Sequence, residues 1–426
     1  MSKVVTGSIS RRSILRAGIG TTALSFIPAM PGIVRAQAQA GAIKIGQVTI
    51  ASGRVAQIGI TSKNAILMEI EAFNNAGGLN GRKIEFHQRD SKGKPEDAAR
   101  FTRDLIESEG CEIILDCEGS GGAFAVHEVV RNSKALGIHC LSETTQLSAD
   151  PKLRSWNTFR TARQALHDSI AGGSFAAGIA KQKNLTRWAT IAADYSYGRE
   201  ATPEFLSYVE ASGAKVNVVA ETWPKLFQPD YTENITKILE ARPEAMFCGL
   251  WGGDLVAFID QGNLFGLFDK VHVFSIHMAD YTTLTAIKTL PTAGVYSSNR
   301  YISTFPATPQ NAAWSDAYRK RYNSLPTNWS WEAALGARCV IEGMKKSGSA
   351  EPVKIAETLK GLEIEAPIGA RNGKIQMRSD DQTAIYYALG WGRIIPKAPY
   401  LVDVQAADWG DVIRQEAAWK KKKGYV

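Results

Sequence analysis

A short glycine-rich segment between two apolar stretches carries the clearest binding chemistry of the chain. The segment Glu118-Gly119-Ser120-Gly121-Gly122 follows a predicted strand and precedes a predicted helix that begins near Ala123. A helix N-terminus presents unpaired backbone N–H groups and the positive end of the helix dipole, so it stabilises a carboxylate, and glycines let that group approach closely. Ser120 is equally suited to an ordinary helix cap, and one residue can serve in both ways.

Two aromatic residues lie in polar or glycine-rich segments that follow predicted strands. Trp251 stands in Gly249-Leu250-Trp251-Gly252-Gly253-Asp254, and Tyr197 stands in Asp194-Tyr195-Ser196-Tyr197-Gly198. Aromatic faces that close on a small apolar or cationic group exclude water at low entropic cost. A tryptophan packed in a core is the alternative, but the glycines beside Trp251 favour a loop.

Sequence motifs for catalysis are absent. The segment His127-Glu128-Val129-Val130-Arg131 lacks the second histidine of a zinc helix, and the chain contains neither a Gly-x-Ser-x-Gly elbow nor a phosphate-binding Gly-x-x-x-x-Gly-Lys-Ser/Thr loop. Gly390-Trp391-Gly392 is predicted to be a turn at a strand end, and none of the cysteines has metal-ligand spacing. We therefore expect no catalytic residue, no metal and no cofactor.

The elements that would position these loops are clearest between residues 43 and 90. An apolar strand at 43–48 leads through the loop 52–59 into a helix at 61–76, which ends at Gly77 and Gly78 before a second strand that finishes at Asp90. This is the pattern of a βαβ unit. Its first loop lies at the carboxyl end of a parallel strand, where open α/β sheets bind ligands.

The ordered set of this loop, the turn Asn74-Asn75-Ala76-Gly77-Gly78-Leu79-Asn80-Gly81-Arg82-Lys83 and the later Asp90 resembles the leucine/isoleucine/valine-binding protein family of periplasmic solute receptors. The resemblance extends over essentially the whole chain after residue 40. It implies an α/β fold of two Rossmann-like lobes joined by a three-segment hinge, the type I periplasmic binding protein, which closes on its ligand. It assigns 41–160 and 302–368 to lobe I and 161–301 and 369–426 to lobe II, with crossings near 155–161, 294–301 and 369–373.

Alternating apolar patterns predict the elements of both lobes. For lobe I we expect strands at 43–48, 83–88, 112–117 and 138–141 and helices at 61–76, 95–108 and 123–136. For lobe II we expect helices at 165–181, 198–212, 231–241 and 255–265 and strands at 187–192, 215–221, 245–250 and 271–276. Helices at 311–322 and 331–346 return to lobe I, and a strand at 386–392 joins lobe II.

The resemblance also implies ligand-binding residues. In the family, the loop after the third strand supplies a serine and backbone contacts to the ligand carboxylate, which corresponds here to Ser120, Gly121 and Gly122. Thr145, in Ser142-Glu143-Thr144-Thr145, falls where a threonine binds the same carboxylate. Tyr197 and Trp251 fall at aromatic positions over the ligand.

Three of the implied positions depart from the family pattern. Ile58 falls where the best-known members carry an aromatic residue, and Glu143 falls where a small residue offers its carbonyl to the ligand ammonium. Glu143 either points a carboxylate at a cationic ligand or is an exposed loop acid. His277 replaces a glutamate that pairs with the ammonium in amino-acid-binding members. The ligand is therefore either a branched-chain or other amino acid, or an aromatic or other organic carboxylate, or an amide.

The first 40 residues have the pattern of an export signal. Ser10-Arg11-Arg12-Ser13-Ile14-Leu15-Arg16 precedes a short apolar stretch and the small-residue triplets Ala36-Gln37-Ala38 and Ala38-Gln39-Ala40, which indicates a twin-arginine signal peptide cleaved after Ala38 or Ala40. A membrane anchor fits less well, because Gly18, Gly20 and Pro28 interrupt a run that is already short for a bilayer. Removing five basic residues lowers the formal net charge from +8 to +3, which gives no reason to expect nucleic-acid binding.

Five cysteines are an odd number for an oxidising compartment. Cys111 and Cys117 are too far apart along one predicted strand to pair. Cys117 and Cys140 end neighbouring predicted strands, so they either form a disulfide or remain buried free thiols.

These observations predict an exported periplasmic protein that binds a small molecule and delivers it to the membrane permease of an ABC importer, without chemistry of its own. Export would require the twin-arginine machinery. The alternatives are a ligand sensor for a signalling partner and an exported hydrolase that uses Ser120 or His277. The missing output domain disfavours the sensor, and the missing motifs disfavour the hydrolase.

Overall fold

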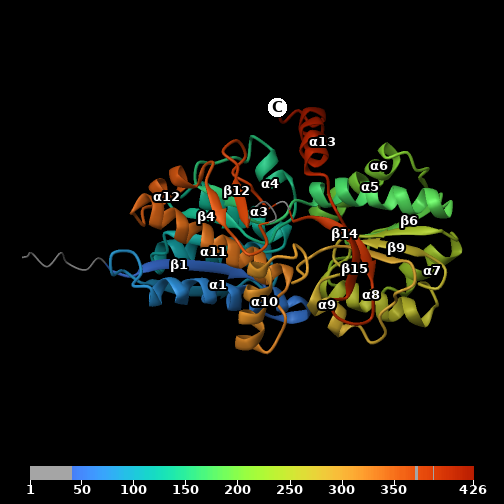
Figure 1. The fold of residues 1–426 in the computed structure, drawn as a ribbon, viewed down its shortest axis with the longest axis horizontal. Coiled ribbons are helices and arrows are strands. Elements are labelled where there is room, and N and C mark those ends of the chain that lie inside the picture. Colours follow the sequence, from blue (N-terminus) through green and yellow to red (C-terminus); the bar gives the residue numbers. More distant parts are fainter. Residues whose placement is uncertain (1–40, 370–372, 387) are drawn as a thin grey trace, which may run out of the picture. The chain divides into compact units, whose positions relative to one another are not determined.

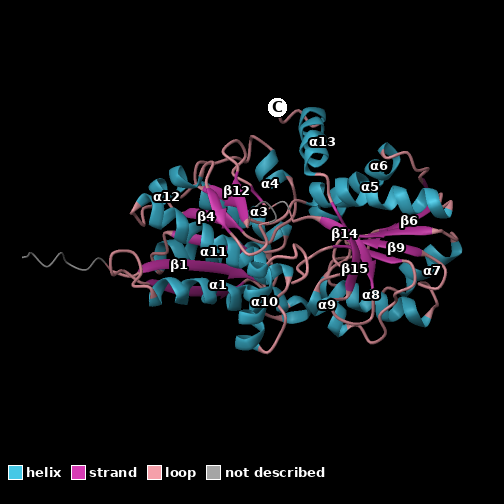
Figure 2. Ribbon diagram, viewed as in Figure 1, coloured by secondary structure: helices cyan, strands magenta, loops and turns pink. Residues whose placement is uncertain are grey.

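The computed structural model describes residues 41–369, 373–386 and 388–426. The expected signal segment 1–40, with both cleavage positions, lies outside the described residues, as do residues 370–372 of the expected third crossing. In the described part, no helix is both long and apolar enough to span a bilayer. This part forms an α/β fold around two large sheets, each flanked by helices (Figures 1 and 2).

The first sheet has five parallel strands in the order β2-β1-β3-β4-β5. They are β1 (Ile43–Thr49), β2 (Ile84–Asp90), β3 (Ile113–Cys117), β4 (Leu136–His139) and β5 (Thr158–Arg160). Alternate side chains of β3 enter different cores, since Ile113 packs in one and Ile114 in another. The helix α1 (Gln57–Asn75) contributes to the first core, and α2 (Pro95–Arg103) and α3 (Ser120–Arg131) contribute to the second. Helices therefore cover both faces, as a buried parallel sheet requires.

The second sheet has seven strands in the order β15-β14-β10-β9-β8-β6-β7. The strands from β6 to β10 run parallel, β14 pairs antiparallel with β10, and β15 pairs antiparallel with β14. Its strands are β6 (Arg187–Ile191), β7 (Asn217–Thr222), β8 (Ala245–Cys248), β9 (His272–Ser275), β10 (Val295–Ser298), β14 (Gly390–Ile394) and β15 (Leu401–Ala406). Its helices are α5 (Ala165–Lys183), α6 (Ser196–Ala211), α7 (Thr232–Glu240), α8 (Gly252–Leu264) and the short α9 (Tyr281–Ala286).

The chain then returns to the first sheet. The helices α10 (Pro309–Tyr322), α11 (Asn328–Ser347) and α12 (Pro352–Leu359) follow β10, and α11 packs against α1 (Figure 1). A small sheet joins β11 (Glu363–Glu365), β12 (Lys374–Met377) and β13 (Ala384–Ile385). The expected α/β fold of two lobes is thereby confirmed. We call the five-stranded sheet with these returning elements the first lobe and the seven-stranded sheet with its helices the second lobe.

The third passage between the lobes comes later in the chain than the sequence suggests. The strands β12 and β13 pair with β11, and Thr383 bridges to Arg160 of β5, so this stretch belongs beside the first sheet. The chain therefore reaches the second sheet only after Ile385. The predicted strand at 386–392 begins instead at Gly390 of β14, because the Tyr386 hydroxyl donates a hydrogen bond to the Thr161 carbonyl (3.3 Å) and holds that residue near β5.

Helix boundaries show where local hydrogen bonds override apolar pattern. The predicted helix at 123–136 is wrong at both ends, since α3 runs from Ser120 to Arg131 and Leu136 opens β4. The backbone N–H and the hydroxyl of Ser133 both donate to the Val130 carbonyl, at 2.9 and 2.8 Å, which ends the helix. Two other segments differ from the predicted type of structure. A 3₁₀ turn (Gly53–Val55) lies within the predicted loop 52–59, and a π-helical turn (Asp104–Ser108) follows α2 within the predicted helix 95–108.

The C-terminal helix α13 (Trp409–Lys422) packs on α5 of the second lobe. Lys420, the first of four consecutive lysines near the C-terminus, is buried and pairs with Asp381 (2.8 Å), which follows β12 in the first lobe. Glu416 of α13 pairs with Arg378 of the same segment (2.8 Å). The helix thus packs on the second lobe and is tied by ion pairs to the first.

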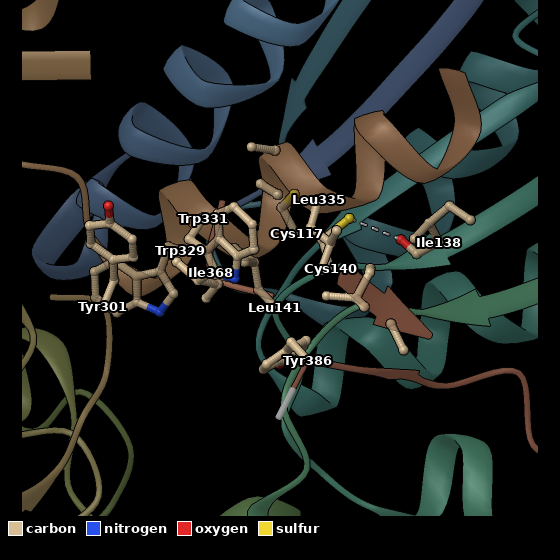
Figure 3. Close-up of a cluster of buried hydrophobic side chains, with 14 of the residues drawn as sticks. Cys117, Ile138, Cys140, Leu141, Tyr301, Trp329, Trp331, Leu335, Ile368 and Tyr386 are labelled. Carbon is tan, nitrogen blue, oxygen red and sulfur yellow. Dashed lines mark hydrogen bonds between the residues drawn. The ribbon is translucent and has the colours of Figure 1, made fainter. Parts of the chain in front are cut away.

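The five cysteines are all buried free thiols, which decides between the two alternatives for Cys117 and Cys140. Figure 3 shows both residues beside Leu335 and Trp331 of α11, with the Cys140 thiol donating to the Ile138 carbonyl (3.4 Å). They belong to the apolar contact between the first sheet and α11.

Candidate functional site

A cavity with about 370 Å³ of empty space lies where the two lobes meet. Residues that follow strands of the first sheet form one wall, completed by one residue of α11: Ile58, Glu118, Ser120, Leu141, Glu143 and Trp329. Residues that follow strands of the second sheet form the other wall: Tyr195, Tyr197, Trp251 and His277. The carboxyl ends of parallel strands meet at one edge of a sheet, so these positions converge although they are distant in sequence.

Six of the nine residues expected at the site line this cavity, namely Ile58, Ser120, Glu143, Tyr197, Trp251 and His277. Gly121 and Gly122 do not line it but lie in the first turn of α3. Any side chain at position 122 would clash with the carboxyl group of Glu118, because an added Cβ would come within 2.5 Å of its Oε2 atom. Gly122 therefore lets Glu118 pack against the start of the helix.

Thr145 lies away from the cavity lining and is fully buried. Its backbone N–H donates to Glu200 of α6 (2.7 Å), and its hydroxyl accepts from the Leu166 N–H (3.3 Å). These partners direct the residue toward the second lobe. It opens the short helix α4 (Gln146–Ala149) as its N-cap.

The N-terminus of α3 reaches the cavity without a side-chain cap. Gly119 is the N-cap residue and Ser120 is the first residue of the helix, so Ser120 is not the cap that the sequence allows as an alternative. The Ser120 hydroxyl lies 3.4 Å from that of Ser142, which also lines the cavity. The first helical bond runs from the Ala123 N–H to the Gly119 carbonyl, so the earlier N–H groups stand outside the helical ladder. This end can hold an anionic group.

Neutral hydroxyl and ring groups make up the second-lobe wall. The indole N–H of Trp251 donates to the Tyr195 hydroxyl (2.7 Å), and the Tyr197 hydroxyl lies 2.8 Å from Nε2 of His277. Burial raises the pKa values of both tyrosines, so both keep their protons. Burial, together with the nearby charge of Arg300, holds the pKa of His277 well below its usual range. The imidazole is therefore neutral and attracts no anion by charge.

Glu118, beside the N-terminus of α3, is a buried acid that lines the cavity. Burial raises its pKa well above the ordinary value, and the nearby Asp116 and Asp90 add to the shift, although a hydrogen bond to Ser91 opposes it. Its Oε1 atom has no hydrogen-bond partner among the described residues. In its protonated form, Glu118 can donate a hydrogen bond into the cavity.

Glu143 is buried and forms an ion pair with Arg300, so it is not the exposed loop acid that the sequence allows. Arg300 follows β10, is fully buried and also lies 3.9 Å from Asp168 of α5 (Nη1 to Oδ2). Arg163, in turn, donates to Asp168 (2.6 Å). Because these charges alternate in sign, the cluster behind the cavity carries no excess negative charge.

Sequence reasoning missed several residues of this site, among them Glu118, Tyr195, Trp329 and Arg300. Glu118 and Tyr195 stand in segments selected from the sequence for other residues, whereas Trp329 lies two residues before the predicted start of its helix. Arg300 gives no local signal, because its partner Glu143 is 157 positions away. Among the described residues, no group of histidine, cysteine or acidic side chains has the arrangement of a metal site.

Comparison with known proteins gives a consistent result. A family model described as periplasmic binding protein matches residues 42–388. A Leu/Ile/Val-binding protein homolog of Brucella abortus (strain 2308) is 26% identical over 390 residues, which cover 88% of each chain.

Two solved structures share the fold at lower identity. One is a solute-binding protein of an ABC transporter from Rhodopseudomonas palustris BisB5 in complex with 3,4-dihydroxybenzoic acid, with a TM-score of 0.76, 22% identity and coverage of 87% of this chain and 99% of that chain. The other is a branched-chain amino acid transporter substrate-binding protein from Streptococcus pneumoniae in complex with isoleucine, with a TM-score of 0.73, 17% identity and coverage of 86% and 99%.

Proposed function

The chain belongs to the periplasmic binding protein family, and from that premise we propose that it binds a small organic carboxylate with an apolar or aromatic body between its two lobes and delivers it to an ABC importer. The architecture is that of the type I fold. Solved structures of this fold hold an aromatic acid in one case and an amino acid in another, so the fold alone does not choose the ligand. The choice has to come from the side chains of the cavity.

One observation carries the preference for a carboxylate without an ammonium group. The cavity has an uncapped helix N-terminus, which favours an anion, and its described lining residues offer no free negative charge that could pair with an ammonium. Glu143 already pairs with Arg300, and the raised pKa of Glu118 favours its neutral form. His277 is neutral as well. An amino acid would bring a positive charge into a buried space that offers it no counter-charge.

The apolar part of the ligand would contact the ring and aliphatic surfaces of the cavity. Ile58, Leu141 and Trp329 supply such surface on the first lobe, and Trp251 supplies it on the second. Because the walls belong to different lobes, closure would bury the ligand, and ligand binding would favour the closed arrangement.

Export through the twin-arginine pathway, residence in the periplasm and delivery to a membrane permease complete the proposal. They rest on the residue pattern of 1–40 and on membership of the family. We propose no catalytic role, because family membership favours binding without chemistry. Incubation of the pure protein with each ligand, followed by a search for products, tests that part.

A thermal-unfolding screen with matched ligand pairs tests the ligand class. The pairs are 4-methylpentanoate with leucine and 3-phenylpropanoate with phenylalanine, since the members of each pair differ only in the ammonium group. A ligand at 100 times its Kd adds about 2.7 kcal/mol to the free energy of unfolding. We expect the plain carboxylates to stabilise the protein more than their amino analogues. Stabilisation by the amino acids alone would make the chain an amino-acid receptor, and no stabilisation by any carboxylate would overturn the proposal.

Trp251→Ala provides a test of the cavity itself. Trp251 is 7% exposed, lines the cavity and bonds to Tyr195, so its removal takes away ring surface and leaves that hydroxyl without its donor. We expect calorimetric titration to show binding weaker by at least about tenfold, or about 1.4 kcal/mol. Trp156→Ala is the matched control, because Trp156 is 40% exposed and does not line the cavity. Wild-type affinity in Trp251→Ala would remove this residue from the site.

A further inference from the structure

The two carboxylate oxygens of Glu143 have different surroundings. Oε1 accepts a hydrogen bond from Nη2 of Arg300. Oε2 has no hydrogen-bond partner among the described residues, although Nε2 of His277 lies 3.7 Å away. Glu143 is 5% exposed and lines the cavity. A buried carboxylate oxygen at a ligand cavity is a strong acceptor with unused capacity.

We propose that Arg300 is a positioning residue that sets ligand specificity, because it fixes Glu143 as a charge-compensated acceptor for a neutral hydroxyl group and thereby disfavours an ammonium group at the same place. The inference rests on the proposed function. It predicts that the site prefers 2-hydroxy carboxylates to 2-amino carboxylates.

The location of Glu143 indicates which part of the ligand it meets. Ser142, the residue before it, lies within 3.4 Å of Ser120 (hydroxyl to hydroxyl), at the N-terminus of α3 where the ligand carboxylate is proposed to bind. Glu143 is therefore the next residue in the chain after one that lies beside the proposed anion-binding end of α3. In the ligand, the carbon attached to the carboxylate group is the α-carbon. Its substituent is the group that Glu143 would contact.

Charge decides between a hydroxyl and an ammonium at that place. Arg300 is fully buried, so its charge is poorly screened by solvent, and Glu143 and Asp168 are its acidic partners. An ammonium bound to Glu143 would add a second positive charge close to the guanidinium. A hydroxyl donor uses the same Oε2 atom without that repulsion.

Several described groups near Glu143 add no uncompensated negative charge. His277 is neutral, and the Tyr197 hydroxyl bonded to it keeps its proton. Farther back in the cluster, Arg163 compensates Asp168. Burial, with Glu143 as a second cause, raises the pKa of Glu332 to about 8, which leaves that acid largely protonated at neutral pH.

Three ligands of identical skeleton test the inference: 4-methylpentanoate, 2-hydroxy-4-methylpentanoate and leucine, which carry hydrogen, hydroxyl and ammonium on the α-carbon. Calorimetric titration at neutral pH gives the ranking. For the wild type we expect the hydroxy acid to bind at least about tenfold more tightly than leucine. In Arg300→Gln, which removes the charge but keeps a hydrogen-bond donor, the ratio should move toward leucine by at least about tenfold. Arg300→Lys keeps the charge and should retain the wild-type ranking.

Each outcome has a distinct meaning. If the wild type binds none of the three ligands or other carboxylates, the proposed function fails and this inference fails with it. If the wild type binds carboxylates but Arg300→Gln keeps the ranking within about twofold, only the inference is overturned. Should Arg300→Gln not fold, Glu143→Gln decides instead: its amide can still accept from a hydroxyl but lacks the negative charge, so leucine should lose affinity relative to 4-methylpentanoate if Glu143 faces the α-substituent. Unchanged ratios among the three ligands in that variant overturn the inference.

Discussion

Two groups of charged or ionisable side chains, most of them buried, join the lobes, and they differ in how completely their polar atoms are satisfied. In the α13 cluster, defined as His167, Arg378, Asp381, Glu416 and Lys420, each side chain has a polar partner within hydrogen-bond distance. In the cavity cluster, defined as Glu143, Arg163, Asp168 and Arg300, four polar atoms lack a hydrogen-bond partner among the described residues, namely Glu143 Oε2, Asp168 Oδ2, Arg300 Nε and Arg300 Nη1.

The difference separates a structural role from a binding role. A buried ionic network whose partners are all present rigidifies a contact, and every charge in it has a counter-charge. Buried polar atoms without partners cost free energy unless another group completes them. Of the four atoms, Glu143 Oε2 belongs to a residue that lines the cavity, so this atom indicates where a ligand interacts. The α13 cluster indicates instead how the C-terminal helix holds both lobes.

Glu416→Ala should give the largest effect, and it should affect stability alone. Burial raises the pKa of Glu416, but His167 and Arg378 more than offset this and hold the pKa well below its usual range. Removing the carboxylate leaves Arg378 with one acidic partner fewer, and Lys420 loses its partner within α13. We expect urea unfolding to show a loss of about 3–5 kcal/mol.

The matched control for this variant is Arg319→Ala, since the Arg319–Asp316 pair is exposed and such pairs contribute little. The ranking of ligands by the folded Glu416→Ala protein should equal that of the wild type. A changed ranking would contradict the division between the two clusters.

The same contrast explains which parts of the site could be predicted from the sequence. Tyr197, Trp251 and His277 follow the ends of three neighbouring parallel strands, β6, β8 and β9, so local pattern and family resemblance were sufficient to bring them to one cavity. Local sequence patterns of this kind were also sufficient to predict the order of strands and helices along the chain.

Side-chain partners across the lobes gave no such signal. Thr145 lies outside the cavity lining, and its backbone N–H donates to Glu200 on α6, a partner 55 positions later in the chain. Arg300 and Glu143 are 157 positions apart in the sequence, and no local pattern near either residue predicts that they pair. The passage after Ile385 depends in the same way on the pairing of β12 and β13 with β11. What the sequence lacks is therefore the long-range pairing of polar groups.

Glu332→Gln should alter how stability depends on pH. Glu332, on α11, is fully buried and accepts hydrogen bonds from the Arg163 N–H (2.9 Å) and from Asn328 (2.7 Å). Burial raises its pKa to about 8, so the folded protein keeps a proton that the unfolded chain loses. This contribution to stability is complete below the unfolded pKa near 4.5 and is lost as the pH rises toward 8.

The glutamine of the variant has no titratable proton, so its contribution to stability does not change with pH. Between about pH 5 and pH 8, we expect the unfolding free energy of the wild type to fall relative to that of Glu332→Gln by more than about 1.4 kcal/mol, which corresponds to one pKa unit. Chemical unfolding at several pH values measures the difference. Parallel pH profiles of the two proteins would show that the acid is ionised throughout, and an additional negative charge would then lie beside the cavity cluster.

Glu118→Gln should give the smallest effect, and it should appear in binding rather than stability. Glu118 lines the cavity beside the N-terminus of α3, and burial raises its pKa well above the usual range. While the acid is neutral it tolerates a ligand carboxylate nearby. As the pH rises through this raised pKa, the new negative charge should repel the ligand, so the affinity of the wild type for 4-methylpentanoate should fall by up to about tenfold, or about 1.4 kcal/mol. In Glu118→Gln, calorimetric titration should give an affinity that stays constant with pH, because the amide does not ionise. A matching decline in both proteins would assign the pH dependence to another group and leave Glu118, despite its unpaired oxygen, outside the ligand site.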